Sequence, residues 1–443
     1  MVSFLICAAL VLAAADDTAP KNDTAPKDNA AVKAELADQT AQLVRQLDAQ
    51  QLAQRDEAEH KLMELGPDVL PLLPAIGERT SAEVALRITR VQQKLLRAQV
   101  LAAAEPSLVT LKGADLPLSE VFKDISKQTG NAINDHREAF GEQKDEVRVK
   151  VDFDKTPFWR AMDNVLDQAE LTLYPFAGQH SAHVVSRPPG TAARSAGAVY
   201  AGLFRLEGVR FEAVRDLRNE QMESLKFFLE VTWEPRLQPF AIFQPLGQIT
   251  VQGNTGEAIA VASSEAEPEV LVREGTSAAE LEIPLVLPKR STKKISVLKG
   301  KLLALVPGPF HDFRFSELPV AVKNVAPQRV EQRKASTTVT LDQVRKNNEA
   351  WEVSLRVKFD APSTALESHR SWVLENEAFF EDAKGQRIEP GGIEQTLQSK
   401  DEMGINYFFD LKAGPEKLTF VYRTPITILE MPVTYEFRDL RLP

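Results

Sequence analysis

Beyond residue 198, nearly every apolar segment of this chain has the two-residue period of a β-strand. The segments are short, they are bounded by Pro or Gly, and no apolar stripe with helical spacing lies between them. Short strands joined by tight turns favour an antiparallel β-sandwich. The expected strands of the first part are 203–206, 227–233, 249–251, 281–287, 294–298, 302–306 and 313–315.

The order of these strands recurs farther along the chain. Strand 227–233 is echoed by 351–357, and the later strands follow in the same order. Spacings differ by only a few residues, as changes of surface-loop length produce. The sequence therefore predicts two tandem antiparallel β-sandwiches, the first over residues 199–330 and the second over residues 335–443.

The last strand of each copy carries two aromatic residues separated by one position. Phe313 and Phe315 end the first copy, and Tyr435 and Phe437 end the second. Because residues two apart on a strand share a face, each pair is expected on the inner face of its own sandwich. Deleting the final nine residues should then unfold only the second sandwich.

Length and charge limit the possible classes of protein. A chain of 443 residues predicts several domains. Lys and Arg number 53 against 63 Asp and Glu, a net charge of −10, and no long basic run occurs. Nucleic acid is therefore not an expected partner. Phosphate-binding glycine loops, calcium loops and dinucleotide motifs are absent, so no cofactor is expected.

The N-terminus has the pattern of an export signal. Residues 4–15 form an apolar run that ends in three alanines before two aspartates, which predicts a signal peptide over residues 1–15 with cleavage near Ala15. The only cysteine, Cys7, would be removed with it. Residues 16–30 contain Asp-Thr-Ala-Pro-Lys twice and are expected to be a disordered tether. The mature chain is expected to be soluble and periplasmic or secreted, with no integral membrane segment.

Residues 31–104 have helical periodicity. Leu47, Leu52, Leu62 and Leu70 belong to a leucine pattern over residues 47–73 that resembles one HEAT-like repeat. Such a repeat cannot bury its apolar face alone. This region is therefore expected to be a helical layer that docks on another element.

Residues 107–186 alternate between strand and helix. Strand 147–153 has a strict two-residue period, and two helices place Phe122, Ile125 and Leu166 on their apolar stripes, so these three are expected in one core. Residues 187–198 lack periodicity and are expected to be a linker.

The order of motifs in this region carries a resemblance. Leu116-Pro117-Leu118-Ser119 starts one helix, Gln128-Thr129-Gly130 ends it, and Thr156-Pro157-Phe158-Trp159 starts the next. This pattern resembles the short N-terminal domain of secretins and TonB-dependent receptors. The resemblance implies a small α/β module that contacts partner proteins and has no catalytic residues. No pore or receptor barrel is expected downstream.

Four residues could be considered as metal ligands. His180 and His183 are the only close histidine pair, and Asp152 and Asp154 are expected nearby in the same sheet. On a strand, positions three apart point to opposite faces, so both imidazoles would meet one ion only in a turn. Solvated residues at a hairpin tip are the favoured interpretation, and no metal site is predicted.

Other residue patterns suggest chemistry less specifically. Ser368 and His369 are adjacent, a spacing at which an imidazole does not ordinarily reach the preceding hydroxyl. The carboxylate pairs Asp152/Asp154 and Glu375/Glu377 would each share a face of a strand, as a glycosidase pair could, but solvated strand faces are favoured. An exposed aromatic shelf is the alternative to core packing for Trp233, Trp351, Trp372, Phe379 and Phe380.

The sequence thus predicts a multidomain protein with a helical layer, a small α/β (α+β) module and two antiparallel β-sandwiches. The expected function is non-catalytic protein interaction in the cell envelope, through the module or through a sandwich edge that accepts a partner strand. One alternative is an exported hydrolase, metal-assisted or acting on glycans. Another is a soluble accessory component of an outer-membrane secretion or uptake complex. Neither the partner nor the oligomeric state follows from the sequence.

Overall fold

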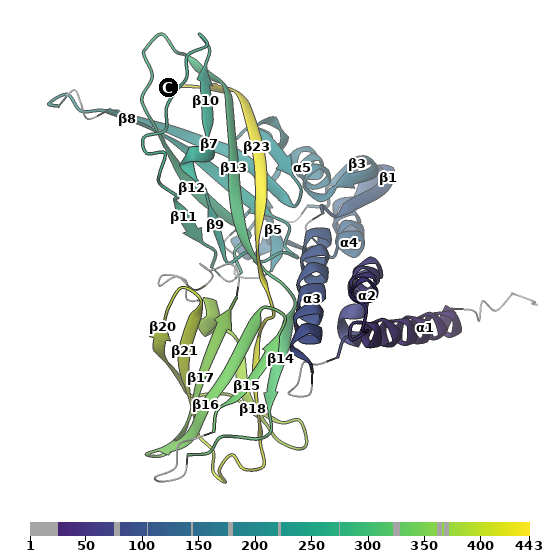
Figure 1. Ribbon diagram of the computed structural model, residues 1–443. Coiled ribbons are helices and arrows are strands. Elements are labelled where there is room, and N and C mark those ends of the chain that lie inside the picture. The colour runs from purple at the N-terminus through teal and green to yellow at the C-terminus, as the bar shows by residue number, and fades with distance from the viewer. Residues whose placement is uncertain are drawn as a thin grey trace, which may run out of the picture. The chain divides into compact units, whose positions relative to one another are not determined.

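The protein consists mostly of β-sheets with few helices (Figure 1). The computed structural model describes residues 25–74, 80–103, 105–142, 145–175, 180–219, 223–273, 275–321, 328–360, 366 and 372–443. Contacts divide the chain into two compact units, Met1–Val91 and Gln92–Pro443. The expected signal peptide lies outside the described residues. No helix among the described residues is long and apolar enough to cross a membrane.

The N-terminal part is helical, as expected for residues 31–104. It contains α1 (Ala25–Gln46), α2 (Leu52–Glu64), the 3-10 turn η1 (Pro67–Leu72) and α3 (Ala82–Ala103). Its buried apolar residues include Leu43, Leu47, Ala58, Leu62, Ile88 and Val91.

Helix α1 begins inside the segment that was expected to be a tether. The tether prediction is therefore wrong for residues 25–30, which are helical. Alanine has the highest helix propensity, and two of these six residues are alanines. Pro26 stands in the first turn, where the missing N–H has no intrahelical partner in any case.

The α/β module contains two sheets rather than the single sheet that was expected. β1 (Leu108–Pro117) pairs with β3 (Arg148–Pro157), and β5 (Ser181–Ser186) lies between β2 (Ala132–Asp135) and β4 (Leu171–Leu173). A two-residue period shows which residues face a core, but it does not show which strand is the neighbour. A 3-10 turn, η2, spans Glu138–Phe140.

The two helices of the module bury one face each against these sheets. α4 (Leu118–Thr129) ends at Gly130, which has the left-handed conformation (φ 71°) that favours glycine, and α5 spans Phe158–Gln168. Phe122, Ile125 and Leu166 lie in one buried cluster, which confirms the prediction for these three residues.

Two sheets follow that share one hydrophobic cluster, and we call them the first sheet pair. One sheet has the order β12-β8-β7-β6, and the other has the order β10-β13-β9-β11, with β23 also paired to β13. The strands are β6 (Ala198–Ala201), β7 (Phe204–Arg215), β8 (Glu223–Trp233), β9 (Ala241–Phe243), β10 (Thr250–Gly253), β11 (Glu269–Leu271), β12 (Ala278–Leu285), β13 (Lys294–Pro307) and β23 (Ile428–Arg441). Short 3-10 turns occur at η3 (Arg194–Ala196) and η4 (Leu246–Gln248).

The second sheet pair comprises the orders β15-β16-β17-β21-β20 and β14-β22-β18-β19. Phe409 on β21 contacts Phe380 on β18 and Phe420 on β22, with ring centroids 4.7 Å and 6.2 Å apart, so the two sheets pack face to face. The strands are β14 (Phe310–Phe315), β15 (Val330–Lys334), β16 (Thr337–Asn347), β17 (Ala350–Phe359), β18 (Ala378–Glu381), β19 (Arg387–Ile388), β20 (Gly392–Gln398), β21 (Glu402–Phe409) and β22 (Thr419–Pro425); η5 spans Trp372–Glu375.

The two strands that carry the aromatic pairs are exchanged between the sheet pairs. β14 follows β13 in the chain but pairs with β22, and β23 follows β22 but pairs with β13 (Figure 1). The expectation that each aromatic pair lies in its own sandwich is therefore wrong. The boundary expected near residues 330–335 does not separate the two sheet pairs either.

One register runs through both pairings. Pro307 faces Ile428, and Phe310 faces Pro425. Between them, the N–H of Gly308 donates to the carbonyl of Thr427 at 2.8 Å. Residues 294–315 and 419–441 thus form one continuous antiparallel ribbon that belongs to both sheet pairs.

Two local features hold β23 in the first sheet pair. Gly300 lies opposite Tyr435, and a Cβ at this position would collide with the Tyr435 ring. The Tyr435 hydroxyl donates to Oε1 of Gln244 at 2.7 Å inside the protein. Leu440 also lies in the ladder, opposite Ile295.

Candidate functional site

The two histidines considered as metal ligands have different neighbours. His180 is exposed, and its Nδ1 lies 3.0 Å from Oε1 of Gln238. His183 on β5 is buried, with Nε2 2.8 Å from Oγ of Ser181 and Nδ1 3.0 Å from Nε2 of His136. The two imidazoles do not share one partner.

His183 instead belongs to a Ser–His–His chain that the sequence analysis missed. Ser181 precedes it by two residues on β5, so the two side chains share a face, and His136 follows the parallel neighbour β2. Asn134 Nδ2 also donates to Ser181 Oγ at 3.0 Å. Ser181 is 3% exposed and His183 is 1% exposed, so a substrate could reach the hydroxyl only if the module opened. The Ser-x-His spacing of Ser181 and His183 was the sequence feature from which this pair could have been predicted.

The aspartates lie on a different sheet from these histidines. Asp152 and Asp154 are on β3, which pairs with β1, whereas His183 is in the sheet of β2, β5 and β4. Asp152 forms an exposed ion pair with Lys112, with Nζ and Oδ1 3.1 Å apart. The expected proximity of these groups in one sheet is therefore wrong. In the described part of the chain, no group of three or more His, Cys, Asp or Glu could hold a metal ion.

Two further sets of chemical candidates remain. Ser368 and His369 lie outside the described residues. Glu375 ends η5, and Glu377 precedes β18, so these two carboxylates are not on one strand as was expected. Glu377 Oε2 lies 3.3 Å from Nη1 of Arg387 at the surface.

The aromatic residues pack into the interior, so the expected alternative of an exposed shelf is not formed. Trp233, Trp372, Phe379 and Phe380 are buried, and Trp351 is half-buried. Trp233 lies in the cluster of the first sheet pair. Core packing, the favoured interpretation of these residues, agrees with their positions.

The segment expected to be a linker is tied down by a buried ion-pair network. Asp163 on α5 is fully buried; its Oδ1 accepts from Nε of Arg194 at 2.9 Å, and its Oδ2 accepts from Nε of Arg205 at 2.6 Å. The Tyr200 hydroxyl also donates to Oδ2, at 2.8 Å. A lack of periodicity indicates irregular backbone, not a lack of contacts, so this connecting segment can still be held by side chains of the module. The network fastens the α/β module to β6 and β7.

The charges of this network depend on one another. Burial lowers the pKa of Arg194, and the positive charge of Arg205 lowers it further. Burial also acts to lower the pKa of Arg205, but the carboxylates of Asp163 and Glu207 outweigh it and raise the pKa. Asp163 is therefore the shared counter-charge of two buried arginines.

Asp167, one turn after Asp163 on α5, gives a pH-dependent prediction. Burial acts to raise its pKa, but the hydroxyl and N–H of Ser195, the N–H of Arg194 and the Arg187 side chain donate to it and lower the pKa overall. A carboxylate with a lowered pKa stabilises the fold above its unfolded pKa of about 3.9, and this contribution is lost as pH falls through the folded pKa.

We therefore expect Asp167→Asn to be less stable than the unmodified protein at pH 7, with a difference that shrinks below about pH 4. The urea concentrations at the midpoint of unfolding, measured for both proteins at pH 7, 5 and 3, give this difference in stability. Asp154→Asn, on the exposed face of β3, is the control and should show no such trend. A difference for Asp167→Asn that is as large at pH 3 as at pH 7 would contradict the assignment.

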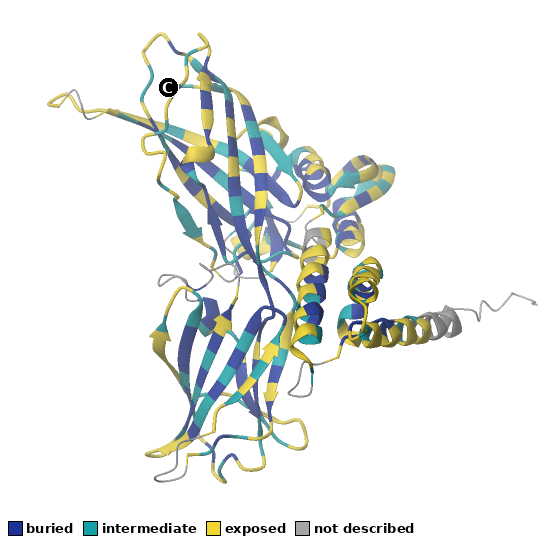
Figure 2. Ribbon diagram, in the orientation of Figure 1, coloured by how far each residue is buried: buried dark blue, intermediate teal, exposed yellow. Residues whose placement is uncertain are grey.

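Strand β20 lies at the edge of its sheet among the described strands. It is the outer strand of its sheet and pairs with β21, and no other described strand pairs with it. Its residues are exposed or half-buried (Figure 2), and Ile393 and Leu397 each expose more than two-fifths of their surface. Glu394 is its only charged residue.

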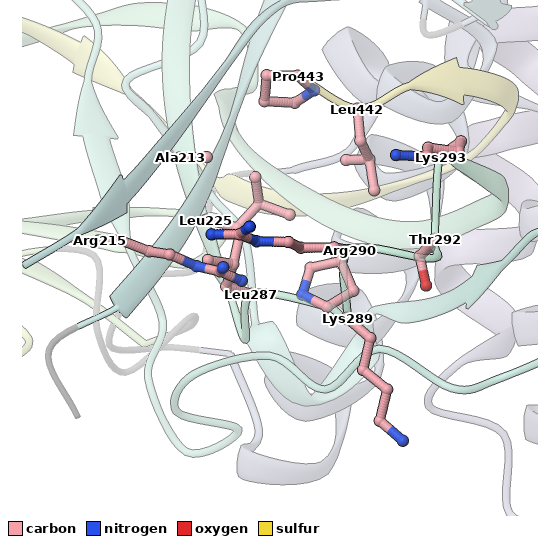
Figure 3. A pocket seen from close by; sticks show the side chains of 11 residues that line it. Ala213, Arg215, Leu225, Leu287, Lys289, Arg290, Thr292, Lys293, Leu442 and Pro443 are labelled. Atoms are coloured by element: carbon pink, nitrogen blue, oxygen red, sulfur yellow. The ribbon is translucent and has the colours of Figure 1, made fainter. Parts of the chain in front are cut away.

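A pocket opens between the two sheets of the first sheet pair (Figure 3), and we call it the mouth. Its volume is about 430 Å³. Its apolar lining includes Ala213, Leu225, Leu287 and Leu442, and its basic residues are Arg215, Lys289, Arg290 and Lys293.

The sequence analysis missed the mouth and did not single out β20. Arg215 comes from the end of β7, whereas Lys289, Arg290 and Lys293 come from the loop between β12 and β13, so two segments that are distant in the sequence meet there. Comparisons of the chain with protein-family models, with curated proteins and with solved structures find no match.

Proposed function

We propose that this protein is an exported, non-catalytic interaction protein of the cell envelope that binds an extended segment of a partner at the free edge of β20. In this proposal each sheet pair is a β-sandwich, the α/β module is of the secretin type, and the helical region is HEAT-like. The observation that carries the proposal is that no described strand pairs with the outer edge of β20.

Two other edge strands, β12 and β15, carry protection that β20 lacks. β12 has Glu280, Glu282 and Pro284 along its length, and β15 has Arg333 and Lys334. Charges and proline at an edge prevent unwanted strand addition. An edge that is long, almost uncharged and partly apolar supports the opposite role, in which a partner strand extends the sheet.

The chemistry of β20 indicates the kind of segment it would accept. Backbone N–H and C=O groups on its free edge would bond to any extended chain, which provides affinity without sequence preference. Ile393 and Leu397 would pack against apolar side chains at alternate positions of the partner. The segment is therefore expected to be an extended stretch with alternating apolar residues.

Photo-crosslinking in intact host cells tests the proposal. A photoreactive amino acid replaces Thr396 on β20 in one strain and Glu331 on β15, the opposite edge of the same sheet, in another. We expect a discrete crosslinked envelope protein from position 396 and none from position 331. Mass spectrometry of the product should place the crosslink in one extended segment of the partner.

A paired substitution shows whether the sheet edge itself makes the contact. Ile393→Lys with Leu397→Lys puts charges on the edge without touching the core, and we expect the crosslink from position 396 to disappear. Exposed Val286→Lys with Leu271→Lys is the matched control and should leave it intact. Equal products from both edges, or a product that survives the β20 charges, would contradict strand addition.

A further inference from the structure

The mouth of the first sheet pair gathers positive charge in an acidic protein. The chain has a net charge of −10, yet four basic side chains line this one pocket. Arg215 has an exposed ion pair with Glu223, with Nε and Oε2 3.3 Å apart. Among the described residues, no ion pair is found for Lys289, Arg290 or Lys293.

Two of these charges face each other. In Figure 3 the side chains of Arg215 and Arg290 extend toward one another beside Leu225. Like charges that converge repel each other, so an anion between them is stabilising. The planar fork of guanidinium donors matches the oxygens of a phosphate or carboxylate.

The floor beneath these charges is apolar. Ala213 on β7 lies opposite Leu225 on β8, and Phe211 lies opposite Phe227, so these residues share the inward face of the sheet. A second hollow of about 400 Å³ shares Leu442 and Pro443 with the mouth, and its lining includes Phe211, Phe227 and Leu440 as well as Arg210 and Arg441. The apolar surface thus continues from the mouth along the gap between β7 and β23.

We propose that the mouth binds an anionic single-chain amphiphile, with the charged head between Arg215 and Arg290 and the alkyl chain along Phe211 and Leu440. Each of the two hollows has the size of a small-molecule site. A basic entrance with an apolar floor matches a ligand that is charged at one end and apolar along the rest. This site is separate from the edge of β20 and does not depend on the proposed strand addition.

Calorimetric titration of the full chain tests the proposal, with dodecyl phosphate as the probe below its micelle-forming concentration. We expect saturable binding of one molecule. Dodecyl maltoside, which has the same chain and no charge, and inorganic phosphate, which has the charge and no chain, should each bind at least about 10-fold more weakly. Equal binding of either compound would overturn the proposal.

Variants test separately the basic residues that would bind the charged head and the apolar surface that would bind the alkyl chain. Arg290→Glu and Arg215→Glu should each weaken binding of dodecyl phosphate by about 10-fold or more. Arg423→Glu, an exposed arginine on β22, is the charge-matched control and should change the affinity less than about 2-fold. Ala213→Trp fills the floor and should weaken binding of dodecyl phosphate without changing the weak response to inorganic phosphate.

Another occupant of the mouth would give a different result. A short extended peptide of alternating Val and Glu, capped at both ends, presents the same charge on a polypeptide. If this peptide binds the unmodified chain more tightly than dodecyl phosphate does, the mouth recognises acidic protein segments and the amphiphile proposal is wrong. Unchanged binding of dodecyl phosphate in Arg290→Glu would overturn it as well.

Discussion

Truncating the chain after Thr434 is expected to unfold the first sheet pair and to leave the second one folded. The deletion removes Tyr435 and Phe437, which are buried in the cluster shared by β8 and β13. Loss of one buried aromatic side chain costs about 3–5 kcal/mol, and a whole domain is stable by only about 5–15 kcal/mol. Hydrogen exchange read by mass spectrometry should show lost protection over 223–233 and retained protection over 402–409.

Two point variants form a matched pair for the same test. Phe437→Ala should loosen the first sheet pair, and Phe315→Ala should loosen the second, because β23 and β14 are exchanged. Each is expected to cost about 3–5 kcal/mol. If Phe437→Ala instead raised exchange in β21 and left β8 protected, the strand pairing described here would be incorrect.

Removal of the Asp163 carboxylate is expected to have the second large effect. Asp163→Ala leaves Arg194 and Arg205 buried without their shared counter-charge, which should destabilise the protein by about 3–5 kcal/mol. Urea denaturation followed by tryptophan fluorescence measures this loss of stability. Trp159 is a suitable probe because it lies on the same helix and donates from Nε1 to the carbonyl of Leu203 at 2.9 Å.

Asp152→Ala is the control for this variant, since its carboxylate is paired with Lys112 at the surface. It should change stability by less than about 0.5 kcal/mol. A double variant, Asp163→Leu with Arg205→Met, removes both members of one pair and should be less destabilised than Asp163→Ala. Equal midpoints for Asp163→Ala and Asp152→Ala would show that the buried network contributes little.

Periodicity located most elements because it reports which residues face a core. Val149, Val151 and Phe153 alternate with charged residues, and all three are buried on β3. Ile125 and Leu166 follow from helical spacing in the same way. These inferences need only the neighbouring residues of one element, so a single sequence is sufficient for them.

Strand partners require information that periodicity does not contain. The similarity of Phe315 and Phe437 was detected, and each residue is buried on the strand where it was expected. The sequence pattern is the same whichever sheet pair receives the strand, so the exchange was not predictable. The collision that a Cβ at Gly300 would make with Tyr435 becomes visible only once the two strands are paired.

The candidate sites were missed for a related reason. Histidine and carboxylate spacing drew attention to His180 and Asp152. In the structure His180 contacts Gln238, and Asp152 is paired with Lys112. Arg215 and Arg290, which extend toward each other in the mouth, lie on separate elements that are distant in the sequence. Convergence of distant residues is a property of the topology, and no local motif records it.

The ribbon that joins β13 to β23 also determines when the protein can fold. Tyr435 bonds to Gln244, which precedes it by 191 residues, so the first sheet pair is completed by a strand that is synthesised after all of its other strands and after those of the second sheet pair. Until then β13 has an open edge at which a wrong strand could pair. Contacts so distant in sequence also slow folding. The second sheet pair, whose strands all precede β23, is therefore expected to fold first, and the first sheet pair is expected to be completed only after β23 has been synthesised.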